Sequence, residues 1–306
     1  MSQQVVSFYR FSSLDPGLLP ELRDRFTRLG LSLDLKGTVL LATEGVNGSL
    51  WGPELALQTM LAEIEQVPGL APLQAQACAA MAPAFRHFKV RLKNEIVSLG
   101  RPDVLPQQGV GVYVPPAAWN ELVDDPDTLL IDTRNAYEVR VGHFPGAIHP
   151  QSTSFREFPD WTRTELEPFL QDHPKRRLAL FCTGGIRCEK ATAFLLQEGF
   201  DQVYHLQGGI LNYLRQVPAA ESRWSGECFV FDQRVSLNHQ LQSGSHALCH
   251  GCRMPLSQQD TELPSYVEGV SCRYCLTLHS DGDRQRFAER QRQLLLARGR
   301  DSRDHG

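Results

Sequence analysis

Cysteines are the residues best suited to chemistry in this chain of 306 residues, which contains eight of them. Six form three close pairs: Cys182/Cys188, Cys249/Cys252 and Cys272/Cys275. Cys78 and Cys228 stand alone. The start, MSQQVVSFYRF, lacks the cationic and apolar regions of a signal peptide. Because spaced cysteines in a long cytoplasmic chain are more often reactive thiols or metal ligands than disulfides, the pairs predict chemistry rather than cross-linking.

The segment FCTGGIRCEKA (181–191) puts Cys182 on a tight loop between an apolar strand pattern and a helical pattern. Its two glycines permit the positive φ angles that turn successive backbone N–H groups toward one point. The helix N-terminus and the Arg187 guanidinium add positive potential. We therefore expect an exposed thiolate on Cys182 near neutral pH, below the pKa of about 8.5 of a free thiol. The expected anion cradle comprises Thr183, Gly184, Gly185 and Ile186.

Cys182 and Cys188 each have a simpler, structural interpretation. Cys182 could be a buried cysteine at a strand end, with glycines that serve only the turn. Cys188 could resolve a persulfide or sulfenic acid on Cys182 as a disulfide, or it could be a helix residue that merely packs.

The two CxxC pairs, Cys249-His-Gly-Cys252 and Cys272-Arg-Tyr-Cys275, are separated by residues 253–271. This spacing is typical of a four-cysteine zinc site, in which each pair supplies two thiolates. Four protein ligands leave no open coordination position, so the predicted zinc is structural. The alternatives are a metal-free or redox-active tail and a site for a different metal.

A basic row is predicted in FRHFKVRLKN (85–94), where a period of two separates apolar from basic residues. The candidate contacts to a nucleic-acid backbone are Arg86, His87, Lys89, Arg91 and Lys93. The arginines that follow near the C-terminus, at 284, 286, 290, 292 and 298, support this interpretation. The net charge of −4 confines any such surface to a local patch, and a solvated strand is the simpler alternative.

Strand and helix patterns divide the chain into four segments. Residues 1–100 show the order βαββαβ of a ferredoxin-like α+β domain, with a helix closed by Gly30, a hairpin turn at Asn47-Gly48 and a last strand pair in 85–100. Residues 101–116 are predicted to be a linker that could hold one strand. Residues 117–218 alternate strands and helices as in a doubly wound α/β domain, and 219–306 form a CxxC region with a basic helix. No apolar run reaches the roughly 18 residues of a membrane span, so we expect a cytoplasmic protein.

Three motifs together resemble the rhodanese family: LLIDTRNAYEVRVGHFPGAIHP (129–150), CTGGIRCEKA (182–191) and HLQGGILNY (205–213). The resemblance implies a persulfide carried by Cys182, with Arg187 at the end of the loop. It also implies supporting roles for Asp132, Arg134 and His143. The six-residue loop suits a sulfur atom, whereas related phosphatases use a loop one residue longer, which argues against a phosphatase.

The order of the segments, with TEGVNGSL (43–50), FKVRLKNEIVSLG (88–100), STSFREFPDW (152–161) and GECFVFDQRVSLNH (226–239), resembles the rhodanese-like tRNA uridine hydroxylases, the TrhO family. That likeness implies oxygen-dependent conversion of the tRNA wobble uridine to 5-hydroxyuridine, with molecular oxygen as co-substrate and the anticodon stem-loop held by the basic row. Nothing in the sequence resembles a flavin, haem or non-haem iron site. The alternatives are a sulfurtransferase that moves sulfane sulfur through a Cys182 persulfide, and an RNA-binding scaffold with a vestigial loop.

Overall fold

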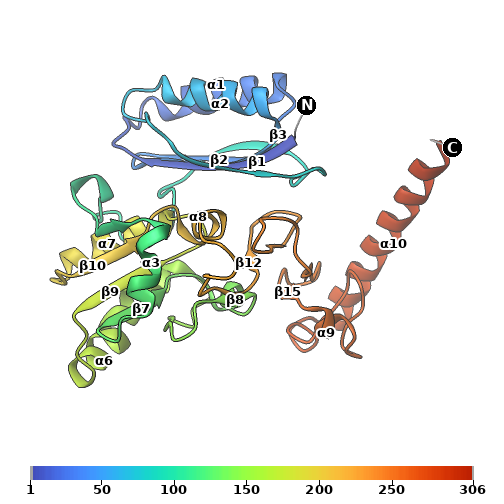
Figure 1. Ribbon diagram of the computed structural model, residues 1–306. Helices are drawn as coiled ribbons and strands as arrows, with labels where there is room; N and C mark the ends of the chain where they lie inside the picture. Colours follow the sequence, from blue (N-terminus) through green and yellow to red (C-terminus); the bar gives the residue numbers. More distant parts are fainter. Residues whose placement is uncertain (1–2, 305–306) are drawn as a thin grey trace. The chain divides into compact units, whose positions relative to one another are not determined.

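The computed structural model describes residues 3–304, with side chains described as far as residue 296 (Figure 1). The chain forms two compact units, Met1–Gln242 and Ser243–Gly306. In the described residues, no helix is long and apolar enough to span a bilayer. The first unit contains the two larger sheets, and the second contains the CxxC pairs.

A five-stranded sheet opens the first unit, in the order β4-β1-β3-β2-β5. Its strands are β1 (Gln3–Phe11), β2 (Lys36–Ala42), β3 (Gly45–Pro53), β4 (Gln74–Ala79) and β5 (Phe88–Leu92). The order of the first four and their antiparallel pairing confirm the ferredoxin-like fold, to which β5 adds a strand parallel to β2. Helices α1 (Leu19–Ser32) and α2 (Glu54–Glu65) lie on one face of this sheet (Figure 1).

The helix-covered face is apolar because alternate strand residues turn toward α1 and α2. Phe8, Val39, Leu41 and Leu50 belong to its buried cluster. The opposite face carries their polar neighbours, including Ser7 and residues discussed below. The strand period of two therefore leaves one face of the sheet free to form a site.

Several local predictions in this domain are wrong. Asn47 and Gly48 lie inside β3, where an added Cβ on Gly48 would come within 2.4 Å of the Phe8 ring. The β2–β3 turn is instead at residues 43–44. Gly30 lies inside α1 against the Phe88 ring, so close packing rather than helix termination requires the glycine. The predicted last strand pair is the single strand β5, and β4 was missed because QAQACA lacks β-branched and aromatic residues.

The second sheet is fully parallel, in the order β6-β10-β9-β7. Its strands are β6 (Val112–Val114), β7 (Thr128–Asp132), β9 (Arg177–Phe181) and β10 (Val203–Leu206). β6 lies within the segment 101–116 and pairs with β10, so part of that segment is built into the sheet. The main helices are α3 (Pro116–Val123), α7 (Ile186–Gln197) and α8 (Gly209–Gln216).

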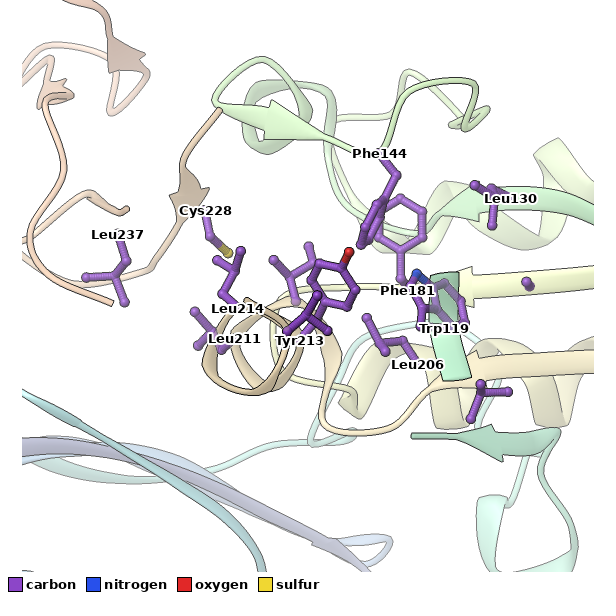
Figure 2. Packing of buried hydrophobic residues seen from close by; sticks show 14 of the residues in the cluster. Trp119, Leu130, Phe144, Phe181, Leu206, Leu211, Tyr213, Leu214, Cys228 and Leu237 are labelled. Atoms are coloured by element: carbon purple, nitrogen blue, oxygen red, sulfur yellow. The ribbon is translucent and has the colours of Figure 1, made fainter. Parts of the chain in front are cut away.

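Both faces of this sheet are covered, as expected for a doubly wound domain. One face packs Leu130, Phe181 and Leu206 with Trp119 of α3 and Tyr213 of α8 (Figure 2). The other face packs a separate cluster against α7, with these members among others: Leu129, Ile131, Leu178, Leu180, Phe194 and Leu195. Gly199, with a φ of 95°, follows α7 as the predicted helix stop.

Short elements complete the first unit. They are the 3₁₀ turns Pro106–Gln108 and Phe155–Glu157, the π-turn Thr162–Leu166, α4 (Ala136–Val139), β8 (Gly142–His143), α5 (Phe158–Trp161), α6 (Glu167–Asp172), β11 (Ser225–Gly226), β12 (Cys228–Phe229) and β13 (Ser236–Leu237).

Buried polar contacts join the ferredoxin-like domain to α7. The Lys190 ammonium, whose side chain is fully buried, lies 2.6 Å from Glu44 Oε2 and 2.7 Å from Glu95 Oε1. The Tyr9 hydroxyl donates to Glu189 Oε1 at 2.7 Å. Since removal of one partner leaves an uncompensated buried charge, such contacts strongly favour one arrangement of the helix against the first domain.

The second unit contains the hairpin β14 (Ala247–Leu248) and β15 (Pro255–Leu256), α9 (Gln258–Thr261) and the long α10 (Asp281–Asp304). Arg284, Arg286 and Arg292 form ion pairs with acidic residues of the same helix. Arg290 donates to the carbonyls of His250 and Gly269. Because these arginines already have partners, α10 offers less positive charge to a nucleic acid than the sequence predicts. The side chain of Arg298 lies outside the described residues.

Candidate active site

Cys182 directly follows β9, at the carboxyl end of the parallel sheet, where open α/β folds bind ligands. The residue is only 1% exposed, and it lines a cavity of about 580 Å³. The prediction of an exposed sulfur is therefore wrong, because Cys182 is buried at the wall of the cavity. A volume of this size is within the usual range for small-molecule sites.

The loop curls as its glycines predict. Gly185 has a φ of 98° and its N–H donates to Cys182 Sγ at 3.1 Å. The first turn of α8 also holds the loop, because Ile210 N–H donates to the Cys182 carbonyl at 2.9 Å. A Cβ on Gly209 would lie 2.4 Å from that same oxygen, so this close approach requires glycine.

Opposing effects set the pKa of Cys182. Burial raises it, but a hydrogen bond from the Cys188 thiol, the charge of Arg187 and the N–H groups of Cys188 and Gly185 lower it to about 6. A thiolate near neutral pH agrees with the sequence-based expectation. Burial and the adjacent Cys182 charge raise the pKa of Cys188, so Cys188 remains a protonated thiol that stabilises its neighbour.

Arg187 is held by a carboxylate that the sequence did not identify. Its two terminal nitrogens donate to both oxygens of Glu138, at 2.8 and 2.7 Å, and the Glu138 side chain is fully buried. Thr183 Oγ1 also donates to Glu138, at 3.4 Å. Burial raises the Glu138 pKa, but the charge and hydrogen bonds of Arg187 outweigh it and lower the pKa, so the carboxylate stays ionised. The only sequence signal was the capping-box pattern in which Asn135 is the N-cap and Glu138 is the N3 residue.

The residues expected to support the loop form a second buried pair. Arg134 and Asp132 share a two-pronged ion pair with distances of 2.9 and 2.6 Å, and Arg134 also donates to the Gly142 carbonyl at 2.7 Å. His143 is exposed in β8. The Arg134 pair therefore links the end of β7 to β8, and Asp132 pairs in the sheet with Phe181, the residue before Cys182.

The open face of the first sheet forms another wall of the cavity. Ser7, Thr38, Asn47 and Ser49 line it, on three neighbouring strands. Gln76 of β4 also lines it and donates to the Gly208 carbonyl at 2.6 Å. The site is therefore shared by two domains that are far apart in the sequence.

Strand register relates the predicted basic row to this wall. Lys89 of β5 pairs with Thr38 of β2, and Arg91 pairs with Leu40. Because paired residues of neighbouring strands point to the same face, Lys89 and Arg91 share the face of the cavity-lining Thr38 and Leu40. All five basic candidates are exposed: Arg86, His87, Lys89, Arg91 and Lys93.

The four tail cysteines converge within the second unit. Their sulfurs all lie within 4.8 Å of one another, with Cys249–Cys275 at 3.9 Å, Cys252–Cys272 at 3.6 Å and Cys272–Cys275 at 3.8 Å. A tetrahedral zinc ion with Zn–S bonds of about 2.3 Å separates its sulfurs by about 3.8 Å. The donor set and its geometry therefore fit a structural metal such as zinc.

Comparison with known proteins agrees with this architecture. Residues 3–96 match the UPF0176 acylphosphatase-like domain, and residues 115–216 match the rhodanese-like domain. The chain is 52% identical over 295 residues to a tRNA uridine(34) hydroxylase of Synechococcus sp. (strain CC9605), covering 95% of this chain and 90% of the relative. It is 49% identical over 298 residues to a protein of that name from Gluconobacter oxydans (strain 621H), covering 97% and 94%. The chain belongs to the family of tRNA uridine(34) hydroxylases.

Proposed function

We propose that this protein hydroxylates uridine 34 of tRNA, with Cys182 as the reactive group in the cavity. One observation carries the proposal: a thiol whose pKa is lowered to about 6 lines a cavity that the rhodanese loop shares with the open face of the first sheet. Near-complete alignment with proteins named for this reaction supports the assignment of substrate. Because the substrate is tRNA, we assign the reaction to the cytoplasm.

The chemistry that we propose uses the Cys182 thiolate as a nucleophile. Addition of its sulfur to C6 of uracil forms a C–S bond and moves the electron pair of the C5–C6 bond to C5 and the O4 carbonyl. C5 then takes up one oxygen atom from an electrophilic oxygen donor. Loss of the C5 proton and departure of the thiolate restore the double bond and give 5-hydroxyuridine. With molecular oxygen as the source, a two-electron reductant must take the second oxygen atom to water.

Arg187 and Cys188 have distinct roles in this proposal. Arg187, held by Glu138, supplies the charge that keeps the Cys182 sulfur anionic. The Cys188 thiol donates a hydrogen bond to that sulfur in the resting site. A persulfide on Cys182 would occupy the same cradle, so sulfur transfer is the second candidate, favoured by the six-residue loop of Cys182 to Arg187.

Nucleoside analysis of tRNA tests the proposed function directly. Bulk tRNA from cells that lack this protein should contain less 5-hydroxyuridine-derived nucleoside at position 34 than tRNA from wild-type cells, and a plasmid copy should restore the wild-type amount. Growth under ¹⁸O₂ should place the label in the new hydroxyl group. Unchanged tRNA together with rapid thiosulfate turnover by the purified protein would instead favour sulfur transfer.

We further propose that the basic row Arg86–Lys93 contacts the anticodon stem-loop. Lys89 and Arg91 point to the face that lines the cavity, and no ion-pair partner of either is found among the described residues. A phosphate backbone along β5 would bring an unpaired loop base toward the cavity, and single-stranded loop bases are the usual targets of RNA-specific proteins.

Removal of two charges from this row should weaken tRNA binding without a change in chemistry. In Lys89→Ala/Arg91→Ala we expect a KM for tRNA about tenfold higher, an unchanged single-turnover rate at saturation, and a salt dependence reduced by about 0.7 to 0.9 in log–log slope per lost phosphate contact. The matched control is Lys175→Ala/Arg176→Ala, because these basic residues precede β9, at the opposite end of the strand from Cys182. An equal effect of both double variants on KM would contradict the proposal.

We assign zinc to the four-sulfur site of the second unit. All four positions of a tetrahedral ion are taken by Cys249, Cys252, Cys272 and Cys275, so the ion stabilises the fold and takes no part in hydroxylation.

A further inference from the structure

We propose that Phe231 is the platform on which the target base stacks inside the cavity, an inference that rests on the proposed function. Phe231 lines the same cavity as Cys182, yet its side chain is 62% exposed. Among the exposed large hydrophobic residues of the described chain, Phe231 alone lines this cavity. The exposed face of this apolar ring would be removed from water if a planar base stacked on it.

Contacts that do not involve the Phe231 ring hold its loop in place. Val230 N–H donates to the Val235 carbonyl at 2.9 Å, and Gln233 N–H donates to the Ala84 carbonyl at 3.0 Å. Asp232 and Arg234 form a two-pronged ion pair with distances of 2.9 and 2.6 Å. The backbone on both sides of Phe231 is thus held in place, while the ring itself stays largely in solvent.

Aromatic neighbours set the orientation of the ring. The Phe229 ring meets it edge-to-face, with centroids 5.1 Å apart, and Phe229 in turn meets Tyr137 at 5.3 Å. The Arg187 guanidinium carbon lies 5.9 Å from the Phe231 centroid. Because Arg187 is itself held by Glu138, this contact places the ring beside the loop that carries Cys182.

A base that leaves its neighbours in the anticodon loop needs a new stacking partner. A base extracted for chemistry loses its stacking partners, and aromatic side chains replace them in proteins that bind single strands. Such stacking is tolerant of base identity, since every base has a π face. Phe231 therefore contributes affinity for the base at position 34, whereas selectivity for uridine comes from contacts to the edge of the base.

A double-mutant cycle between the ring and the base tests this proposal. The RNAs are two full-length tRNAs that differ only at position 34, one with uridine and one with an abasic site. The proteins are wild type, Phe231→Ala, and Leu31→Ala, a control on α1 whose side chain is also 62% exposed but does not line the cavity. We expect Phe231→Ala to weaken binding of the uridine tRNA about tenfold to about a hundredfold, the range for loss of one base–aromatic stack. Binding of the abasic tRNA should be unchanged in Phe231→Ala, and both tRNAs should bind Leu31→Ala as they bind wild type.

A ring-retaining variant gives a direct signal of the contact. Phe231→Trp should keep the affinity of wild type for uridine tRNA, and its indole emission should change with uridine tRNA more than with abasic tRNA. The proposal would be overturned if Phe231→Ala lost the same affinity for both RNAs, or if the indole emission changed equally with uridine tRNA and abasic tRNA. Formation of 5-hydroxyuridine by the wild-type enzyme distinguishes failure of the proposed function from failure of this inference. If none forms, both are overturned. If it forms but the effect of Phe231→Ala does not depend on the base at position 34, only the role of Phe231 is overturned.

Discussion

Cys182→Ser should abolish hydroxylation, with a loss in rate of about 10³-fold or more, a magnitude typical for removal of a group that attacks the substrate. The hydroxyl that replaces the thiol stays protonated near neutral pH, so the cradle of N–H groups and Arg187 no longer holds an anionic nucleophile. The measurement is mass spectrometry of nucleosides from tRNA treated with each enzyme under single-turnover conditions. Full hydroxylation by Cys182→Ser would remove this residue from the mechanism.

The matched control is Cys228→Ala, which removes another fully buried thiol of the first unit. Burial raises the pKa of Cys228 to about 12, so this thiol is unreactive at neutral pH and its loss should leave the rate per folded molecule nearly unchanged. The pH dependence of alkylation by a small reagent gives a second check. Labelling of Cys182 should rise with pH through about 6 and then level off, because the thiolate fraction is complete above that pKa. Labelling that begins only near pH 9 would show that the loop does not stabilise the thiolate.

Removal of the metal should unfold the second unit while the first unit stays folded. Zinc contributes about 10 to 16 kcal/mol to the folding of small zinc-binding peptides, and the second unit has only a small core besides its four cysteines. Cys272→Ser, or a strong chelator, should therefore remove the metal and expose the amides of residues 243–296 to rapid hydrogen exchange. Exchange in residues 3–242 should stay slow because their cores are separate.

Cys228→Ala again serves as the control, since Cys228 lies in the first unit and outside the four-sulfur group. Elemental analysis should find one zinc per chain in wild type and in Cys228→Ala, and none in Cys272→Ser. A Cys272→Ser variant with slow exchange throughout residues 243–296 would show that the unit folds without the metal.

The parts of the site that the sequence predicted are local in the chain. The loop from Cys182 to Arg187, helix α7 and its stop at Gly199 depend on glycine conformation and helix periodicity within about twenty residues. The CxxC spacing predicts that the two sulfurs of each pair lie close together, and the zinc-type spacing of the two pairs predicted that all four would converge, as they do. The alternation in β5 predicted its exposed basic row for the same reason.

Contacts between distant residues were not predictable, because packing of whole elements decides them. Arg187 meets Glu138 across 49 residues, and Lys190 meets Glu44 across 146. The position of Asn47-Gly48 within β3 also depends on a tertiary contact, since Phe8 of the neighbouring strand packs on Gly48. Turn propensity is a weak local preference that such packing overrides.

The amino-acid sequence by itself predicted which thiol has a lowered pKa, which four cysteines could hold a metal and which strand carries the basic row, because local backbone conformation and residue spacing indicate each of these. Only the tertiary structure decided that Cys182 is buried rather than exposed and that a carboxylate holds Arg187. It also decided that the open face of the first sheet and Phe231 complete the cavity. The reason is physical: burial, ion pairing and a shared cavity are properties of surfaces brought together by folding, and no single segment possesses them.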